Sequence, residues 1–140
     1  MSVAADSSVL IAGFLPAHPA LPEATTGLQR VRSGGRLIAH TLAETYATLS
    51  TAPFDVEANT VLDYLDQFNP ESAVGIEPDA LSERLRELDC SGIHGGATYD
   101  ALIAVTARDH GLTLLTLDRR AVRSYEALGT RYELLWEEGS

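Results

Sequence analysis

Short apolar runs alternate along this chain with longer stretches in which apolar residues recur at helical spacing. The apolar runs 3–5, 36–39, 113–117 and 132–136 are predicted to be strands, while 73–76 fits either a short strand or a connector. Helices are expected within 9–12, 19–31, 41–49, 57–68, 78–88, 98–110 and 119–128. This alternation is typical of an α/β domain with a mostly parallel sheet.

Polar residues stand where several of these helices should begin. Asp6 and Asp118 each precede a helix and are expected to be N-caps. Thr41 and Glu44 form a capping-box pattern, in which each side chain binds the other's backbone amide. Thr98 is the expected N-cap of the helix that ends near residue 110.

Two of the helices carry a clear apolar face. Leu81, Leu85 and Leu88 recur at positions i, i+4 and i+7 of one helix. In the helix expected at 57–68, the residues Val61, Leu62, Leu65 and Phe68 lie on one face. These faces either cover the core or form an oligomer interface, and the residues leave both readings open.

Length and composition predict one cytoplasmic domain. The 140 residues are 45% apolar and 21% charged, which suffices for a buried core. We expect the domain to span 1–136 and the tail 137–140 to be frayed. The single cysteine, Cys90, allows no disulfide framework and fits a reducing compartment. No basic segment opens the chain and no run approaches the roughly 18 apolar residues of a membrane span, so neither a signal peptide nor a membrane anchor is expected.

The charge is strongly negative. There are 20 acidic residues and 10 arginines, with no lysine, giving a formal net charge of −10. This sign is wrong for a protein that binds nucleic acid through its overall field. The acids therefore serve a local site, or a basic partner meets them, or the protein does not bind nucleic acid.

Four acids fall where strands end and helices begin. Asp6 and Asp118 directly follow predicted strands, and Asp100 lies two residues after Thr98. Glu44 is placed in the first turn of its helix. Because the carboxyl ends of parallel strands share one edge of a sheet with the following helix N-termini, we expect these four side chains to converge.

The same acids have a simpler explanation, because Asp and Glu are favoured at N-caps and in first turns of helices generally. Two carboxylates about 4 Å apart repel by roughly 4 kcal/mol at an effective dielectric of 20, so four that converge require a cation. Carboxylate oxygens suit Mg²⁺ or Mn²⁺, which lower the pKa of bound water and stabilise charge on a phosphate oxygen. The candidate catalytic and metal-binding residues are Asp6, Glu44, Asp100 and Asp118.

Further residues near the last acid could support such a site. Thr116 either orients Asp118 or a metal-bound water, or is an ordinary strand threonine. Arg119 and Arg120 are expected to contact substrate phosphates, whereas the other clustered arginines are expected to form solvated helix faces.

Other catalytic patterns are missing from the chain. It has no G-x-G-x-x-G, no P-loop and no G-x-S-x-G. Cys90 and His94 lack a second pair of zinc ligands. Cys90 is therefore expected to be a small, partly buried apolar residue.

Three blocks resemble the PIN-domain family, and especially the VapC ribonuclease toxins of bacterial type II toxin–antitoxin modules. They are VAADSSVLIAGF at 3–14, HTLAETYATLS at 40–50 and TYDALIAVTARDHGLTLLTLDRRA at 98–121. The resemblance implies a three-layer α/β/α sandwich and an acidic quartet that binds Mg²⁺ or Mn²⁺ and hydrolyses RNA phosphodiesters. The quartet corresponds to Asp6, Glu44, Asp100 and Asp118, and Thr116 matches a hydroxyl position beside the last acid.

The resemblance also implies partners. Members of the family form homodimers and are silenced by a VapB-type antitoxin whose tail enters the acidic groove. A basic tail would meet the acidic surface of this chain favourably. The expected substrate is a structured RNA that is recognised at a loop.

Two other functions are considered beside the ribonuclease. A catalytically silent protein of the same fold would use its acidic cleft only to bind a basic partner segment, without any need for metal. A phosphoacceptor domain of the receiver type needs a lysine near its acidic pocket, and this chain has none.

Overall fold

The computed structural model describes residues 2–136, in which three short strands form one all-parallel sheet. The strands, in spatial order, are β1 (Val3–Ala5), β2 (Thr113–Thr116) and β3 (Tyr132–Leu134). The helices are α1 (Ser7–Phe14), α2 (Leu21–Arg32), α3 (Ala39–Leu49), α4 (Ala58–Asp66), α5 (Pro78–Cys90), α6 (Ala97–Asp109) and α7 (Arg119–Ala127), with a 3-10 turn at Pro70–Ser72. The predicted parallel α/β fold is confirmed, while the tail 137–140 lies outside the described residues. No helix in the described part has the length and apolar character to span a bilayer.

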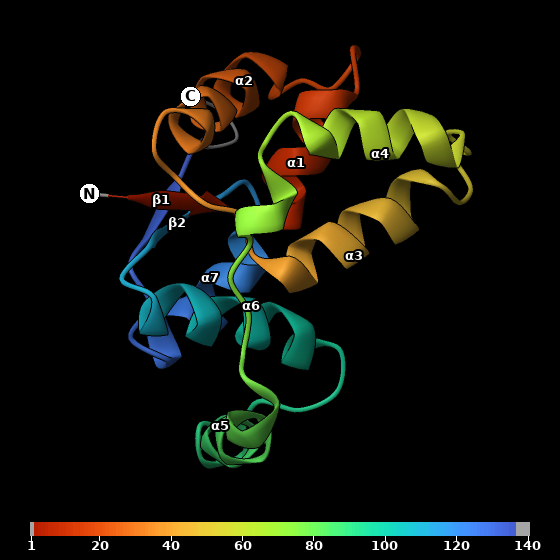
Figure 1. Ribbon diagram of the computed structural model, residues 1–140. Coiled ribbons are helices and arrows are strands. Elements are labelled where there is room, and N and C mark those ends of the chain that lie inside the picture. The colour runs from red at the N-terminus through yellow and green to blue at the C-terminus, as the bar shows by residue number, and fades with distance from the viewer. Residues whose placement is uncertain (1, 137–140) are drawn as a thin grey trace.

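The sheet buries both of its faces, as its alternating side chains require. Val3, Ala5 and Leu115 belong to a core cluster that they share with α1, α2, α3 and α4. Ala4 and Leu114 belong to a second cluster, which includes residues of α6 and α7. Figure 1 shows α1, α2 and α4 above the sheet and α5, α6 and α7 below it. The chain is therefore a three-layer sandwich, as predicted.

The segment 36–39 is not the strand that its apolar residues predict. The backbone amide of Arg36 donates to the carbonyl of Val3 at 3.0 Å, so the segment does run beside β1. Ile38 forms a single parallel bridge with Val74, and α3 begins at the next residue. The segment turns into a helix before a ladder can form, and 73–76 is likewise a connector.

Two predicted helix starts are also wrong. The amide of Ala39 already donates to the carbonyl of Val74 at 2.8 Å, so α3 begins there and Thr41 and Glu44 lie within the helix. Glu44 consequently stands in the second turn and not in the first. The N-cap of α6 is Gly96 instead of Thr98.

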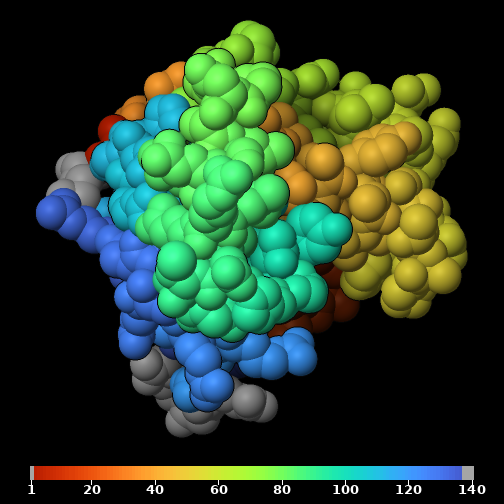
Figure 2. Space-filling model, turned by 90° about the horizontal axis from the view of Figure 1, so that it is seen from below, coloured from red at the N-terminus to blue at the C-terminus, as the bar shows by residue number. Residues whose placement is uncertain are grey.

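Helix α5 lies in the long connection from β1 to β2. It crosses the face seen from below, while α3 and α4 project to one side (Figure 2). Of the apolar face predicted for α5, only Leu88 is buried, and Leu81 and Leu85 are 39% and 42% exposed. Cys90, at the end of the helix, is exposed and not partly buried as predicted. The apolar face of α5 therefore points largely away from the core.

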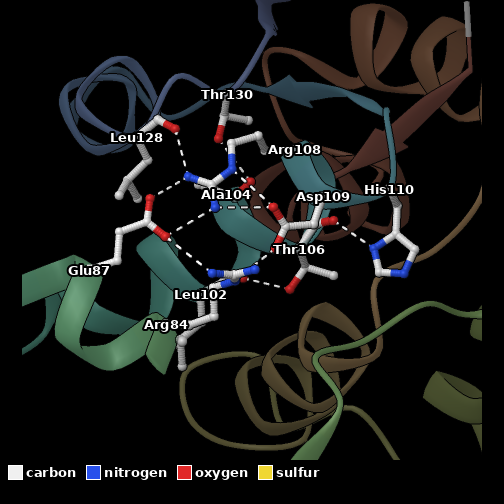
Figure 3. Close-up of polar contacts among 10 residues, drawn as sticks. All are labelled: Arg84, Glu87, Leu102, Ala104, Thr106, Arg108, Asp109, His110, Leu128 and Thr130. Atoms are coloured by element: carbon white, nitrogen blue, oxygen red, sulfur yellow. Dashed lines mark hydrogen bonds and ion pairs between the residues drawn. The ribbon is translucent and has the colours of Figure 1, made fainter. Parts of the chain in front are cut away.

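A charged network attaches α5 to the rest of the molecule (Figure 3). The guanidinium of Arg108, on α6, donates to both carboxylate oxygens of Glu87, at 2.5 and 3.0 Å, and to the carbonyl of Leu128 at 3.0 Å. Arg84 donates to Asp109 at 2.9 Å. The hydrogen bonds from Arg108 hold the pKa of Glu87 below its usual value. Glu87 thus joins α5 to α6 and, through Arg108, to the end of α7.

Candidate active site

Asp6 is the most deeply buried of the four acids. It follows β1, is 3% exposed, and caps α1 by accepting the amide of Val9 at 3.4 Å, so the predicted N-cap is confirmed. The Ser8 hydroxyl donates to the same carboxylate oxygen. The Tyr125 hydroxyl, from α7, donates to the other oxygen at 2.8 Å. Asp6 is thus fixed in position by donors from both ends of the chain.

Burial and hydrogen bonding act on Asp6 in opposite directions. Burial raises its pKa, because the charged form loses solvation, and this effect dominates. Hydrogen bonds from Ser8, Thr116, Tyr125 and the Val9 amide favour the ionised form and lower the pKa in part. The pKa of Tyr125 is itself raised, first by burial and then by the charge of Asp6. The phenol is therefore neutral, and its hydrogen bond favours the ionised form of Asp6.

Asp100 connects the four acids electrostatically. It lies in the first turn of α6, as predicted, and its pKa is raised to about 6. Burial is the largest cause, followed by the charges of Glu44, Asp118 and Asp6, while Arg120 lowers the pKa. The structure therefore brings acids from four separate parts of the chain into one electrostatic neighbourhood.

Glu44 has a carboxylate oxygen that is not used by the protein. Its Oε1 atom is buried and has no hydrogen-bond partner among the described residues. The hydroxyls of Thr41 and Thr45, on the same helix, are buried and unpartnered as well. A buried acceptor without a donor is costly, so this side of α3 is suited to a ligand that binds oxygen.

Asp118 caps α7, as predicted, and accepts the backbone amide of Arg120 at 2.9 Å. The Thr116 hydroxyl accepts the backbone amide of Asp118 at 3.0 Å and is among the groups that lower the pKa of Asp6. Thr116 therefore links the two acids. The Arg120 guanidinium is 97% exposed and lies 3.9 Å from the Asp118 carboxylate. Arg119 is exposed too, so both arginines could reach a ligand.

The sequence did not predict that Ser8 and Tyr125 donate hydrogen bonds to Asp6. The Ser8 hydroxyl binds Asp6 and also accepts the amide of Leu117 at 2.9 Å, which joins the ends of β1 and β2. Its position two residues after an N-cap acid was an available signal. Tyr125 gave no signal, because a buried tyrosine in a helix has the same sequence pattern as a core residue.

The donor set fits a hard divalent cation in charge and chemistry. Asp100 is destabilised by neighbouring negative charges, and Glu44 offers a free buried oxygen. Carboxylates of this kind bind Mg²⁺ or Mn²⁺. Within residues 2–136, however, no three acidic, histidine or cysteine side chains are already arranged as a set of metal ligands. Binding would require the side chains to draw closer, with the cation offsetting their repulsion.

The fold and the site together define an α/β/α protein with acidic side chains gathered at the carboxyl edge of a parallel sheet. A family model described as PIN domain matches residues 3–127. The chain belongs to the PIN-domain family.

Relatives and solved structures agree with this assignment. The chain is 38% identical to Ribonuclease VapC40 of Mycobacterium tuberculosis, over 95% of its own length and 98% of the relative's. It is 34% identical to Ribonuclease VapC27 of the same organism, over 91% and 92% of the two chains. The structure of FitAcB from Neisseria gonorrhoeae matches with a TM-score of 0.68 at 20% identity, over 93% and 95% of the two chains. That of PAE2754 from Pyrobaculum aerophilum matches with 0.59 at 20% identity, over 96% and 84%. VapC ribonucleases of this family generally depend on a divalent metal.

Proposed function

We propose that this protein is a metal-dependent endoribonuclease, the toxin of a type II toxin–antitoxin system of the VapC kind. Its similarity to two ribonucleases over nearly the whole chain supports the activity. The observation that carries the proposal to particular residues is the raised pKa of Asp100, caused in part by three other acids. Helix capping explains the positions of Asp6 and Asp118, but it does not explain why the charges of all four acids act on one another.

The residues of the proposed site have two different roles, metal binding and contact with RNA phosphates. Asp6, Glu44, Asp100 and Asp118 would hold Mg²⁺ or Mn²⁺, which when bound supplies positive charge for an attacking water and a phosphate oxygen. Asp100 must lose its proton before it can bind a cation. The exposed guanidiniums of Arg119 and Arg120 would pair with RNA phosphates, a role for which arginine is well suited.

The proposed partners follow from charge and exposed surface. A VapB-type antitoxin with a basic tail would be attracted to a chain of net charge −10 and would compete with RNA for the acids. A second copy of the chain is the other proposed partner, with the exposed leucines of α5 as one candidate contact. We place the protein in the cytoplasm, where it would meet its RNA.

The test is cleavage of total RNA by the purified protein with Mg²⁺, with Mn²⁺ and with EDTA. We expect discrete fragments that need metal and that fall by about 100-fold or more in Asp100→Asn, because a carboxylate ligand is lost. Asp63→Asn is the control, since Asp63 is an exposed acid on α4. Cleavage by Asp100→Asn at the rate of the unaltered protein would contradict the site assignment.

The acidity of the whole chain favours one alternative. A catalytically silent protein could use the same cleft to bind a basic segment of a partner. It would cut no RNA with either metal, yet would hold its partner in EDTA. Size-exclusion chromatography of the pair in EDTA, beside the cleavage assay, separates the two functions.

A further inference from the structure

Two aromatic rings stack against each other beside the proposed catalytic acids. His40 lies in the first turn of α3 and Tyr99 in the first turn of α6. Their ring centroids are 5.6 Å apart and their planes are inclined by only 5°. The pair therefore bridges the same two helices that bring Glu44 and Asp100 together.

The attachment of the two rings places them close to the acids. His40 and Glu44 are four residues apart on α3, so their side chains lie on the same face of that helix. Tyr99 directly precedes Asp100. Among neighbouring charges, that of Glu44 has the largest effect on the pKa of Asp100. The stacked pair thus stands at the edge of the acidic site.

Tyr99 is open to a ligand. Its side chain is 54% exposed, a high value for a large aromatic residue. Within residues 2–136 the side chains of Tyr99 and His40 make no hydrogen bond, so the stack with His40 is the contact that orients the tyrosine ring. Figure 2 shows atoms of α3 and α6 meeting on the face seen from below, so this region lies at the surface.

An exposed aromatic ring beside the acids offers a way to bind RNA that does not depend on charge. A site rich in carboxylates repels the RNA backbone, so electrostatics alone holds the substrate poorly. Stacking of a base on an aromatic ring needs no charge and works for every base, because every base has a π-face. It does require that the base be unpaired and accessible.

We propose that Tyr99, supported by His40, is a stacking platform for an unpaired nucleobase next to the phosphate that is cleaved. The proposal rests on the proposed ribonuclease function and narrows its substrate to RNA with an unpaired base at the cleavage site. Tyr99 is a positioning residue for the substrate and does not act on the phosphate.

Binding can be tested apart from cleavage. The probes are short RNA hairpins with 2-aminopurine at one loop position in turn, and the protein carries Asp100→Asn so that no probe is cut. Stacking on Tyr99 quenches the fluorescence at one position of the loop. Adding Tyr99→Ala should abolish that quenching and weaken binding by about tenfold, whereas Tyr99→Phe should preserve both. Tyr46→Ala, which removes a 38% exposed aromatic residue of α3, is the matched control and should change neither.

Cleavage by the protein with Asp100 restored gives the second measurement. Tyr99→Ala should raise KM by about tenfold with a smaller change in kcat, and Tyr99→Phe should restore KM. Equal binding and equal quenching by the Tyr99→Ala protein would overturn the platform even if the unaltered protein is a ribonuclease. Quenching that depends on Tyr99, in a protein that cuts no RNA, would instead keep the platform and refute the ribonuclease. Unfolding temperatures of all variants check that the fold is intact.

Discussion

At the scale of single residues, the site is built around one buried carboxylate. Asp6 is only 3% exposed, and the hydroxyls and the amide that donate to it favour its charged form against the larger effect of burial. The donor from farthest along the chain is Tyr125. Through this hydrogen bond the phenol can therefore influence whether Asp6 is ionised and able to bind a cation.

Replacing Tyr125 with Phe tests this control. The variant loses the donor that favours ionised Asp6, so the pKa of Asp6 should rise further. Ribonuclease activity should fall by about tenfold, as is common when a group supporting a metal ligand is removed. Because a carboxylate with a higher pKa is protonated at higher pH, the acid limb of the pH–rate profile should move to higher pH.

Tyr64→Phe is the matched control for that experiment. The Tyr64 hydroxyl donates to the carbonyl of Leu10 at 2.6 Å, and within the part of the chain that the structure describes it makes no hydrogen bond to the four acids. Its loss should leave the pH–rate profile in place. An unshifted acid limb in Tyr125→Phe, with the fold intact, would show that Asp6 does not need the phenol.

At the scale of secondary-structure elements, α5 differs from the other helices in how it is held. Within the described residues its one buried side chain is Leu88, and the ion pairs Arg108–Glu87 and Arg84–Asp109 join it to α6 as well. Hydrogen bonds to charged groups contribute more to stability than neutral ones when they are partly buried. The helix should therefore depend on Arg108 more than on its leucines.

Arg108→Met should lower the free energy of unfolding by about 2 kcal/mol, because Glu87 and the carbonyl of Leu128 lose their donor. Arg86→Met is the control, since Arg86 is exposed on α5 and, among residues 2–136, its side chain donates only to Ser82, at 3.2 Å. It should change stability by less than about 0.5 kcal/mol. Urea unfolding at neutral pH measures both variants, and equal midpoints would show that the network is not stabilising.

The same network sets a pH dependence. The pKa of Glu87 is lower in the folded protein than in the unfolded chain, where it is about 4.5. The contribution of ionised Glu87 to the free energy of unfolding is therefore complete above pH 4.5 and is lost as pH falls through the pKa of the folded protein. The difference between Arg108→Met and the unaltered protein should therefore narrow in acid.

At the scale of the whole molecule, four distant parts of the chain contribute negative charge to one place. The pKa of Asp100, about 6, is raised, so its ionised form is less stable in the folded protein than in the unfolded chain. The protonated Asp100 side chain therefore contributes to the stability of the folded protein, and this contribution is complete below pH 3.8, the pKa in the unfolded chain. It is lost as pH rises through about 6, the pKa in the folded protein. Without metal, burial of Asp100 and repulsion between the acids should thus destabilise the folded protein at neutral pH.

Asp100→Asn should stabilise the metal-free protein at pH 8 by roughly 1 kcal/mol, a value that allows for partial solvent screening of the charge, and should have little effect near pH 4. Added Mg²⁺ should stabilise the unaltered protein and not the variant, because binding to the folded state alone shifts the equilibrium. Thermal unfolding in EDTA and in Mg²⁺ measures both effects. A variant that is less stable than the parent at pH 8 would refute the repulsion.

Local patterns predicted much of this structure. The N-caps at Asp6 and Asp118, the parallel sheet and the first-turn position of Asp100 all followed from short stretches of sequence. The errors arose where a distant contact decided the outcome. The carbonyl of Val74 accepts the amide of Ala39 where α3 begins early, and the charged network holds α5 although Leu81 and Leu85 are exposed. Tyr125 could not be connected to Asp6, because it does not lie at a strand end or a helix start and its sequence pattern is that of a core residue.

The order of the strands has a consequence for synthesis on the ribosome. β1 comprises residues 3–5, and its strand partner within the described chain, β2, begins only at residue 113. At about 5 to 20 residues per second, β1 waits roughly 5 to 20 seconds for the strand that completes its hydrogen bonds. Asp118 and Tyr125 emerge later still. A nascent chain shorter than about 118 residues would therefore carry no complete acidic site and could not yet act as a nuclease.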